Sequence, residues 1–295
     1  MPGIARVRGS PACDSGVVPL RPARSTDTDR LAAILAATGA ELPASLDAYL
    51  SVVVDHGQLL VHEDAPGAAV SGFGGVVPLD DGGALVTDLF VHPAAQGRGV
   101  GGTILDALLT GRPRRTTFSS GHPAALPAYA RRGMAPRWTL HYRNGVVRDV
   151  ASLDIARDSA RGVVVSEVDA PRAVAAELLG RSWLVRWFAD QGARCLELRA
   201  PTGDDLVGAA IVAGQPDGTH RVERLVTIGD ASAATVAVLA WIGVGASVTC
   251  CVPAHSSADE VLERVGFQVV DADTCCSTES DPLPSHLVAL HPGLG

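Results

Sequence analysis

A glycine-rich loop between a strand-like run and a helix-like run constrains this chain more than any other feature. The apolar run Ala84 to Val91 precedes the loop, and the run Thr103 to Thr110 follows it. Residues 92–102 contain four glycines, one arginine and no carboxylate. Glycines let the backbone turn its N–H groups toward a ligand, and a helix N-terminus carries partial positive charge. Strand, loop and helix N-terminus together predict a cradle for a pyrophosphate.

The spacing within the loop narrows the kind of phosphate site. The chain contains no lysine, so the Gly-Lys-Ser/Thr ending of a Walker loop is absent. Gln96-x-x-Gly99-x-Gly101 is present, preceded by Val91-His92-Pro93. With the flanking strand and helix, this pattern resembles motif A of the GCN5-related N-acetyltransferases (GNAT), which bind acetyl-CoA. A plain strand-to-helix turn is the alternative, although it needs fewer glycines.

The resemblance implies a set of cofactor-binding residues. The pantetheine arm of acetyl-CoA would pair with the strand backbone, and the pyrophosphate would lie on the loop. The residues so implied are Leu89, Phe90, Val91, Gln96, Gly97, Arg98, Gly99, Val100, Gly101 and Gly102. His122 stands where the family often has an asparagine that contacts the pantetheine arm, so it is expected to keep a polar contact there.

A second motif and several acidic residues supply candidates for the chemistry. Residues 129–134 (Tyr-Ala-Arg-Arg-Gly-Met) resemble the family's motif B, whose tyrosine protonates the departing thiolate of CoA. This implies Tyr129 as the acid; an ordinary packed tyrosine is the alternative. Asp88 is a candidate base, and strand alternation places it on one face with Phe90. The identity of the base stays open, because other titratable residues lie nearby in the chain, namely Glu63, Asp80, His92 and His122. Candidates for holding a cationic acceptor are Glu41, Asp47 and Tyr49.

The order of predicted elements repeats along the chain. We expect a flexible arm at 1–15, a GNAT domain at 16–145, a linker at 146–162 and a degenerate GNAT-like domain at 163–295. In the second half, Asp230 would stand where a pyrophosphate should lie, and a carboxylate there repels an anion. The expected fold is therefore α/β, with two tandem GNAT-like domains, each a splayed mixed β-sheet flanked by helices.

Composition limits partners and location. The net charge of −8 argues against nucleic-acid binding. No apolar signal segment opens the chain, so a cytoplasmic protein is expected. The uncharged stretch 231–254 is interpreted as a helix followed by a strand, not as a membrane span. The six cysteines lack zinc spacing, so no metal is expected; reduced thiols are favoured, with a disulfide between the two vicinal pairs left open.

These observations predict an acetyl-CoA-dependent N-acetyltransferase that acts on a small-molecule amine by direct transfer in a ternary complex. Natural-product tailoring and self-resistance are both open as its role, and so is a homodimer. The alternative is a non-catalytic acyl-CoA-binding sensor or interaction module. Neither the loop nor the composition identifies the acceptor.

Overall fold

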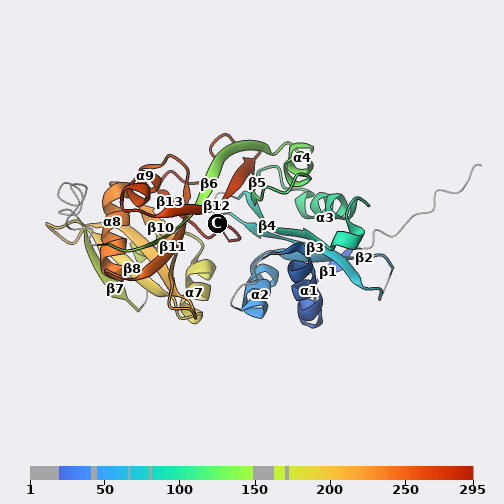
Figure 1. The fold of residues 1–295 in the computed structure, drawn as a ribbon, viewed down its shortest axis with the longest axis horizontal. Coiled ribbons are helices and arrows are strands. Elements are labelled where there is room, and N and C mark those ends of the chain that lie inside the picture. Colours follow the sequence, from blue (N-terminus) through green and yellow to red (C-terminus); the bar gives the residue numbers. More distant parts are fainter. Residues whose placement is uncertain are drawn as a thin grey trace, which may run out of the picture.

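The computed structural model describes residues 20–40, 45–65, 67–79, 82–148, 163–169 and 173–294. The arm predicted at 1–15 and residues 149–162 of the predicted linker lie outside this described part. The described strands form one mixed sheet, with helices on both faces. Figure 1 shows α1, α2 and α7 on one side of the sheet and α3 and α4 on the other.

The elements of the first half follow the predicted order. They are β1 (Leu20–Pro22), η1 (Ser25–Asp27), α1 (Thr28–Thr38), α2 (Leu46–His56), β2 (Gln58–Glu63), β3 (Val70–Pro78), β4 (Ala84–Val91), η2 (Pro93–Ala95), α3 (Val100–Leu109), β5 (Arg115–Ser119), α4 (Ala125–Ala130) and β6 (Ala135–Val146). Leu31, Ile34 and Leu35 recur at helical spacing and are buried, which explains why α1 packs on the sheet.

The second half repeats this order. Its elements are β7 (Val164–Val168), α6 (Ala173–Leu179), α7 (Ser182–Asp190), β8 (Arg194–Arg199), β9 (Leu206–Gly214), β10 (His220–Thr227), α8 (Ala231–Ile242), β11 (Ser247–Pro253), α9 (Ser257–Arg264), β12 (Gln268–Ser277) and β13 (Leu287–Ala289). The repeat confirms the tandem α/β prediction, but β13 was not predicted.

The two halves exchange strands within the sheet. The strand order is β1-β2-β3-β4-β5-β12-β6-β11-β10-β9-β8-β7. Strand β12 of the second half pairs antiparallel with β5, with Cys276 opposite Thr117. Strand β6 of the first half pairs antiparallel with β11, with Tyr142 opposite Cys251. The predicted boundary near residue 146 therefore separates the halves along the chain, whereas the sheet runs across both.

Strands β4 and β5 separate after a short parallel contact. Only Ala84–Val86 pair with Arg115–Thr117. Gly75 then lies opposite Asp88, whereas Val76 lies opposite Val86, so Thr87 is an extra residue that forms a β-bulge. A bulge bends its strand and increases the local twist. The edge of β4 that faces β5 is consequently unpaired beyond the bulge among the described residues.

The equivalent opening in the second half is filled by the chain itself. Strands β10 and β11 pair in parallel only at three positions, His220 to Val222 of β10. Strand β13 then pairs antiparallel with β10, with Leu225 opposite Ala289. The following residue, Leu290, donates its N–H to Cys251 O at 3.1 Å and so ties the segment to β11. Nothing in the sequence pattern predicted this closure.

Other sequence expectations can be compared with the described residues. The five cysteines there, Cys195, Cys250, Cys251, Cys275 and Cys276, are free thiols, and Cys13 lies outside the described part. The stretch 231–254 forms α8 and β11, as predicted. No helix in the described ranges is both long and apolar enough to span a membrane.

The strand exchange predicts a steric dependence of one half on the other. A Cβ at Gly145 of β6 would lie 2.5 Å from the ring of Phe267, which belongs to the second half. Gly145→Ala should therefore lower the free energy of unfolding in urea by about 1–3 kcal/mol. Gly214→Ala is the control, because nothing lies within 4 Å of that Cβ. Equal stability of the two variants would contradict this packing.

Candidate functional site

The loop after β4 is held in shape by its own polar groups. Gln96 Nε2 donates to Val91 O at 3.1 Å, which ties the loop to the end of the strand. Gly97 and Gly99 have φ values of 76° and 86°, a left-handed region that favours glycine. Residue Gly99 is the N-cap of α3. The glycines predicted from sequence are therefore needed to turn the chain into the helix.

The loop presents free donors on an open surface. The N–H groups of residues 97–102 precede the first intrahelical bonds of α3 and, within the described part of the chain, donate to no other group. A Cβ at Gly97 or Gly99 would meet nothing within 4 Å, so an anion can approach the backbone there. Arg98 is exposed beside them. These donors fit a pyrophosphate.

Arg132 fastens α4 to the helix that follows the loop. Its guanidinium donates to Asp106 Oδ1 at 2.9 Å, to Gly102 O at 2.8 Å and to Ala128 O at 2.8 Å. These bonds join the first turns of α3 to the end of α4. Sequence reasoning did not assign this role, although Arg132 belongs to the motif that contains Tyr129.

Tyr129 lies on α4 and packs against Val86, the last residue of β4 that pairs with β5. Its side chain is 5% exposed and packs with Val86, Met134 and Cys276. Burial raises the pKa of Tyr129 to about 12, and the neighbouring Thr117 hydroxyl opposes the rise. The phenol therefore carries its proton at neutral pH, as a proton donor must.

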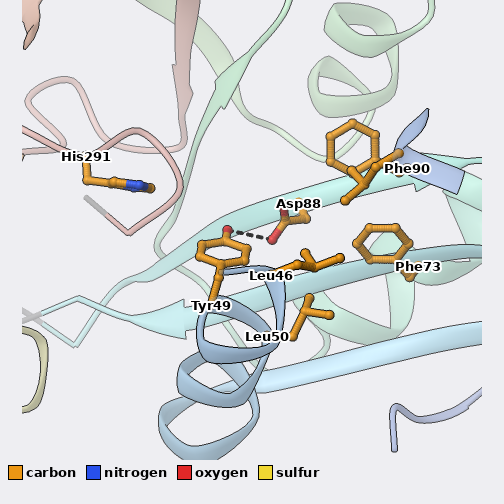
Figure 2. A pocket seen from close by; sticks show the side chains of 8 residues that line it. Leu46, Tyr49, Leu50, Phe73, Asp88, Phe90 and His291 are labelled. Carbon is orange, nitrogen blue, oxygen red and sulfur yellow. Dashed lines mark hydrogen bonds between the residues drawn. The ribbon is translucent and has the colours of Figure 1, made fainter. Parts of the chain in front are cut away.

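The other face of β4 lines a pocket. Asp88 and Phe90 face α1 and α2, whereas Leu89 and Val91 pack on the side of α3, as alternation predicts. Thr87 breaks the alternation that would place it with Leu89 and Val91, because at the bulge its hydroxyl lies on the side of Asp88, where a Cβ at Gly75 would meet both side chains. The pocket has a volume of about 130 Å³. Figure 2 shows its lining residues, which are Leu35, Leu46, Tyr49, Leu50, Phe73, Asp88, Phe90 and His291.

The polar centre of this pocket is a tyrosine–carboxylate pair. Tyr49 Oη donates to Asp88 Oδ2 at 2.8 Å, as the dashed line in Figure 2 marks. Burial raises the pKa of Asp88 above its usual range, and the bond from Tyr49 opposes part of that rise. A carboxylate in such surroundings is a stronger base than an exposed one.

The remaining predicted residues lie apart from this pair. Asp47 is exposed on α2, and Glu41 lies outside the described residues. His122 is exposed, and its Nδ1 accepts from Ala124 N–H at 3.2 Å. In the described ranges, no three His, Cys, Asp or Glu side chains gather as metal ligands would.

The structure adds His291 to the pocket, which sequence reasoning missed. Its ring centroid lies 6.3 Å from that of Tyr49. A Cβ at Gly293 would be 2.8 Å from Tyr49 Oη, so the backbone of the last residues packs closely over the pair. The His291-Pro292-Gly293 run was visible in the sequence, but its position over a pocket of the first half depends on long-range folding.

The counterpart of the loop in the second half is occupied by a side chain. Asp230 is the N-cap of α8, and its Oδ1 accepts from Ser232 N–H at 2.8 Å and from Ala233 N–H at 3.4 Å. The carboxylate therefore satisfies donors that are free in the first half. An N-cap aspartate at this place supplies its own negative charge to the helix terminus.

Comparisons with known proteins agree with this geometry. The family model described as "Acetyltransferase (GNAT) domain" matches residues 55–133, which include the loop and Tyr129. Residues 55–133 of this chain are therefore similar to a GNAT domain. A search of curated protein sequences found no match.

Solved structures share the fold over both halves. A Pyrococcus horikoshii protein provisionally classed as an acetyltransferase is 16% identical, with a TM-score of 0.71 over 93% of this chain and 94% of that chain. A tandem GNAT protein from the clavulanic acid biosynthesis pathway is 16% identical, with a TM-score of 0.60 over 90% of this chain and 99% of that chain. A GCN5-related N-acetyltransferase from Sphaerobacter thermophilus is 14% identical, with a TM-score of 0.56 over 88% and 94%. The fold is thus that of tandem GNAT proteins.

The difference between the two helix N-termini can be tested directly. Gly99→Asp would place a carboxylate at the N-cap of α3, as Asp230 does for α8. We expect calorimetry to show acetyl-CoA binding at least about tenfold weaker than in Gly99→Asn, which has the same shape without the charge. Equal affinity of the two variants would place the pyrophosphate elsewhere.

Proposed function

We propose that the protein is an acetyl-CoA-dependent N-acetyltransferase that acetylates a small-molecule amine in a ternary complex. One observation supports this above the others: β4 carries a free edge that leads to the open loop, and the face of β4 toward α1 and α2 carries the Asp88–Tyr49 pair. A donor on the edge and an acceptor in the pocket would share one strand. Such an arrangement brings two substrates together in a fixed orientation.

The residues present fit the cofactor that GNAT folds generally use. The N–H groups of residues 97–102 would hold the pyrophosphate, and the unpaired edge of Leu89 to Val91 would pair with the pantetheine arm in the manner of an added strand. Acetyl-CoA supplies the acetyl group as a thioester. The chain's own residues must then hold the amine and move two protons.

Asp88 would bind and deprotonate the amine. A free amine is mostly an ammonium ion at neutral pH and cannot attack until it loses a proton. The Asp88 carboxylate attracts the ammonium ion and accepts that proton, and the Tyr49 hydroxyl fixes the orientation of Oδ2 at 2.8 Å. The raised pKa of Asp88 favours this transfer.

Tyr129 would provide the second proton. It is buried beside the opening of β4 and β5 and carries its proton at neutral pH, so its hydroxyl would be in place to donate that proton to a departing CoA thiolate. The side chain of Arg132 bonds both helices and so holds α4, and hence Tyr129, against α3. The two proton-transfer groups lie on either side of the bulge of β4: Asp88 directly follows it, and Tyr129 of α4 packs with Val86, which directly precedes it.

The walls of the pocket indicate the size of the acceptor. Five of its lining side chains are apolar, namely Leu35, Leu46, Leu50, Phe73 and Phe90, and its volume is about 130 Å³. These properties favour an amine on a short aliphatic chain over a peptide or an oligosaccharide.

The proposal is tested by measuring acetyl-CoA binding and thiol release on the same protein. Calorimetry with acetyl-CoA should show binding, and a panel of small amines should release free CoA thiol. Binding without thiol release on every amine would support the sensor alternative. No binding would overturn both readings.

Replacing Tyr129 by phenylalanine tests the proton donor. We expect kcat to fall by about 10²–10⁴-fold, with the Kd of acetyl-CoA nearly unchanged, because only the hydroxyl is removed. Tyr142→Phe is the matched variant, since it removes a hydroxyl that already bonds Asp273 at 2.6 Å between β6 and β12. An unchanged kcat in Tyr129→Phe would exclude the assigned role.

Replacing Asp88 by asparagine tests the base. In the wild type, kcat/KM for the amine should fall as the pH drops through a pKa above the usual 3.8 of an aspartate. Asp88→Asn should lose this limb and about 10²–10⁴-fold of activity, whereas the exposed Asp55→Asn should retain both.

Stability should change in the opposite direction with pH. A carboxyl with a raised folded-state pKa stabilises the fold below its unfolded pKa, and this contribution is lost as the pH rises through the folded pKa. Urea unfolding of Asp88→Asn should therefore lack that loss. If the fall of kcat/KM at low pH persists in Asp88→Asn, the base is another group.

A further inference from the structure

The segment from β13 to Leu294, which belongs to the second half, is anchored at both ends and reaches the pocket of the first half through His291. Strand β13 is anchored in the opening between β10 and β11, and Leu290 N–H donates to Cys251 O at 3.1 Å. On the far side of His291, Leu294 is fully buried and its carbonyl accepts a hydrogen bond from Arg181. Figure 1 shows this end of the chain near the middle of the molecule. His291 is therefore held from both sides.

The hydrogen bonds of His291 decide which ring nitrogen carries the proton. Gly293 N–H donates to Nδ1 at 3.1 Å, so Nδ1 is an acceptor and the proton of the neutral ring is on Nε2. Burial lowers the pKa of His291 to about 3, with the positive charges of Arg221 and Arg181 adding to the effect. The ring is thus neutral at the pH of a working enzyme, and within the described ranges no group accepts from Nε2.

The position of the ring relative to the Tyr49–Asp88 pair is set by close packing. Gly293 leaves no room for a Cβ, because that atom would come within 2.8 Å of Tyr49 Oη and 3.3 Å of His291 Cε1. His291 also lies 6.0 Å from the ring of Phe188 on α7. Figure 2 shows the ring directed toward the Tyr49–Asp88 pair.

We propose that His291 selects the acceptor: its Nε2–H donates to an oxygen of an amine substrate whose ammonium group lies on Asp88. This inference rests on the proposed function and names its substrate class, a small amine that also bears an ether, hydroxyl or carbonyl oxygen. An amine without that oxygen would leave a buried donor unpaired, which discriminates strongly between otherwise equal substrates. The half without a cradle would then contribute to acceptor binding.

The test compares two amines of nearly equal size. 3-Methoxypropylamine and n-pentylamine differ by one oxygen in place of a methylene, and the ether oxygen can only accept. Wild-type protein should favour the ether in kcat/KM by at least about tenfold. His291→Phe should reduce this preference to near one with an unchanged Kd for acetyl-CoA, and His291→Gln, which keeps a donor, should restore part of it.

Controls separate this inference from the proposed function. His286→Phe, in the same segment but outside the pocket lining, should keep the wild-type preference. Calorimetric binding of both amines to CoA-saturated protein measures the preference without turnover, so failure of thiol release overturns the proposed function and leaves His291 testable. No preference in the wild type, an equal preference in His291→Phe, or no binding of either amine would overturn the role of His291.

Discussion

The separation of β4 from β5 is the constraint on which the rest of the site depends. Thr117 Oγ1 donates to Val86 O at 3.0 Å at the last paired position, and the bulge at Thr87 follows at once. A strand that kept its partner would have no free edge for a ligand. Because the two strands diverge, β4 has an unpaired edge that leads to the loop. Tyr129 packs beside the last paired residue, Val86, and the side chain of Asp88 points into the pocket.

The second half has the same divergence but has lost the open edge by two local changes. Strand β13 supplies the backbone partner that β10 lacks, and Asp230 supplies the negative charge at the helix N-terminus. In the complex proposed for the first half, an extended arm and a phosphate of acetyl-CoA would take the places that β13 and Asp230 fill in the second half. In the second half, β13 pairs with the backbone of β10, and Asp230 accepts from the first N–H groups of α8. The backbone groups at this place therefore have partners without a bound ligand.

Sequence reasoning predicted what depends on local periodicity and glycine chemistry. The loop at 96–102, the alternation from Asp88 to Val91 and the helix and strand within 231–254 all follow from spacing, whereas the bulge that turns Thr87 to the side of Asp88 does not. The exchange of β6 and β12 could not be predicted, because an alternating pattern indicates a strand but not its neighbour. Helix geometry explains another limit: Asp47 and Tyr49 are two residues apart on α2, so they cannot face the same pocket, and only Tyr49 lies there.

The strand exchange makes the second half part of the site even though it carries no open loop. Strand β12 places Cys276 against Tyr129, so the burial that raises the pKa of that phenol depends on residues from the other half. The indole of Trp187 donates to Ala48 O at 3.2 Å and holds α7 against α2, the helix that carries Tyr49. Separating the halves would expose both proton-transfer groups to water, where a carboxyl and a phenol return to ordinary acidity. The second half therefore contributes to the burial of Tyr129 and to the position of the helix that carries Tyr49.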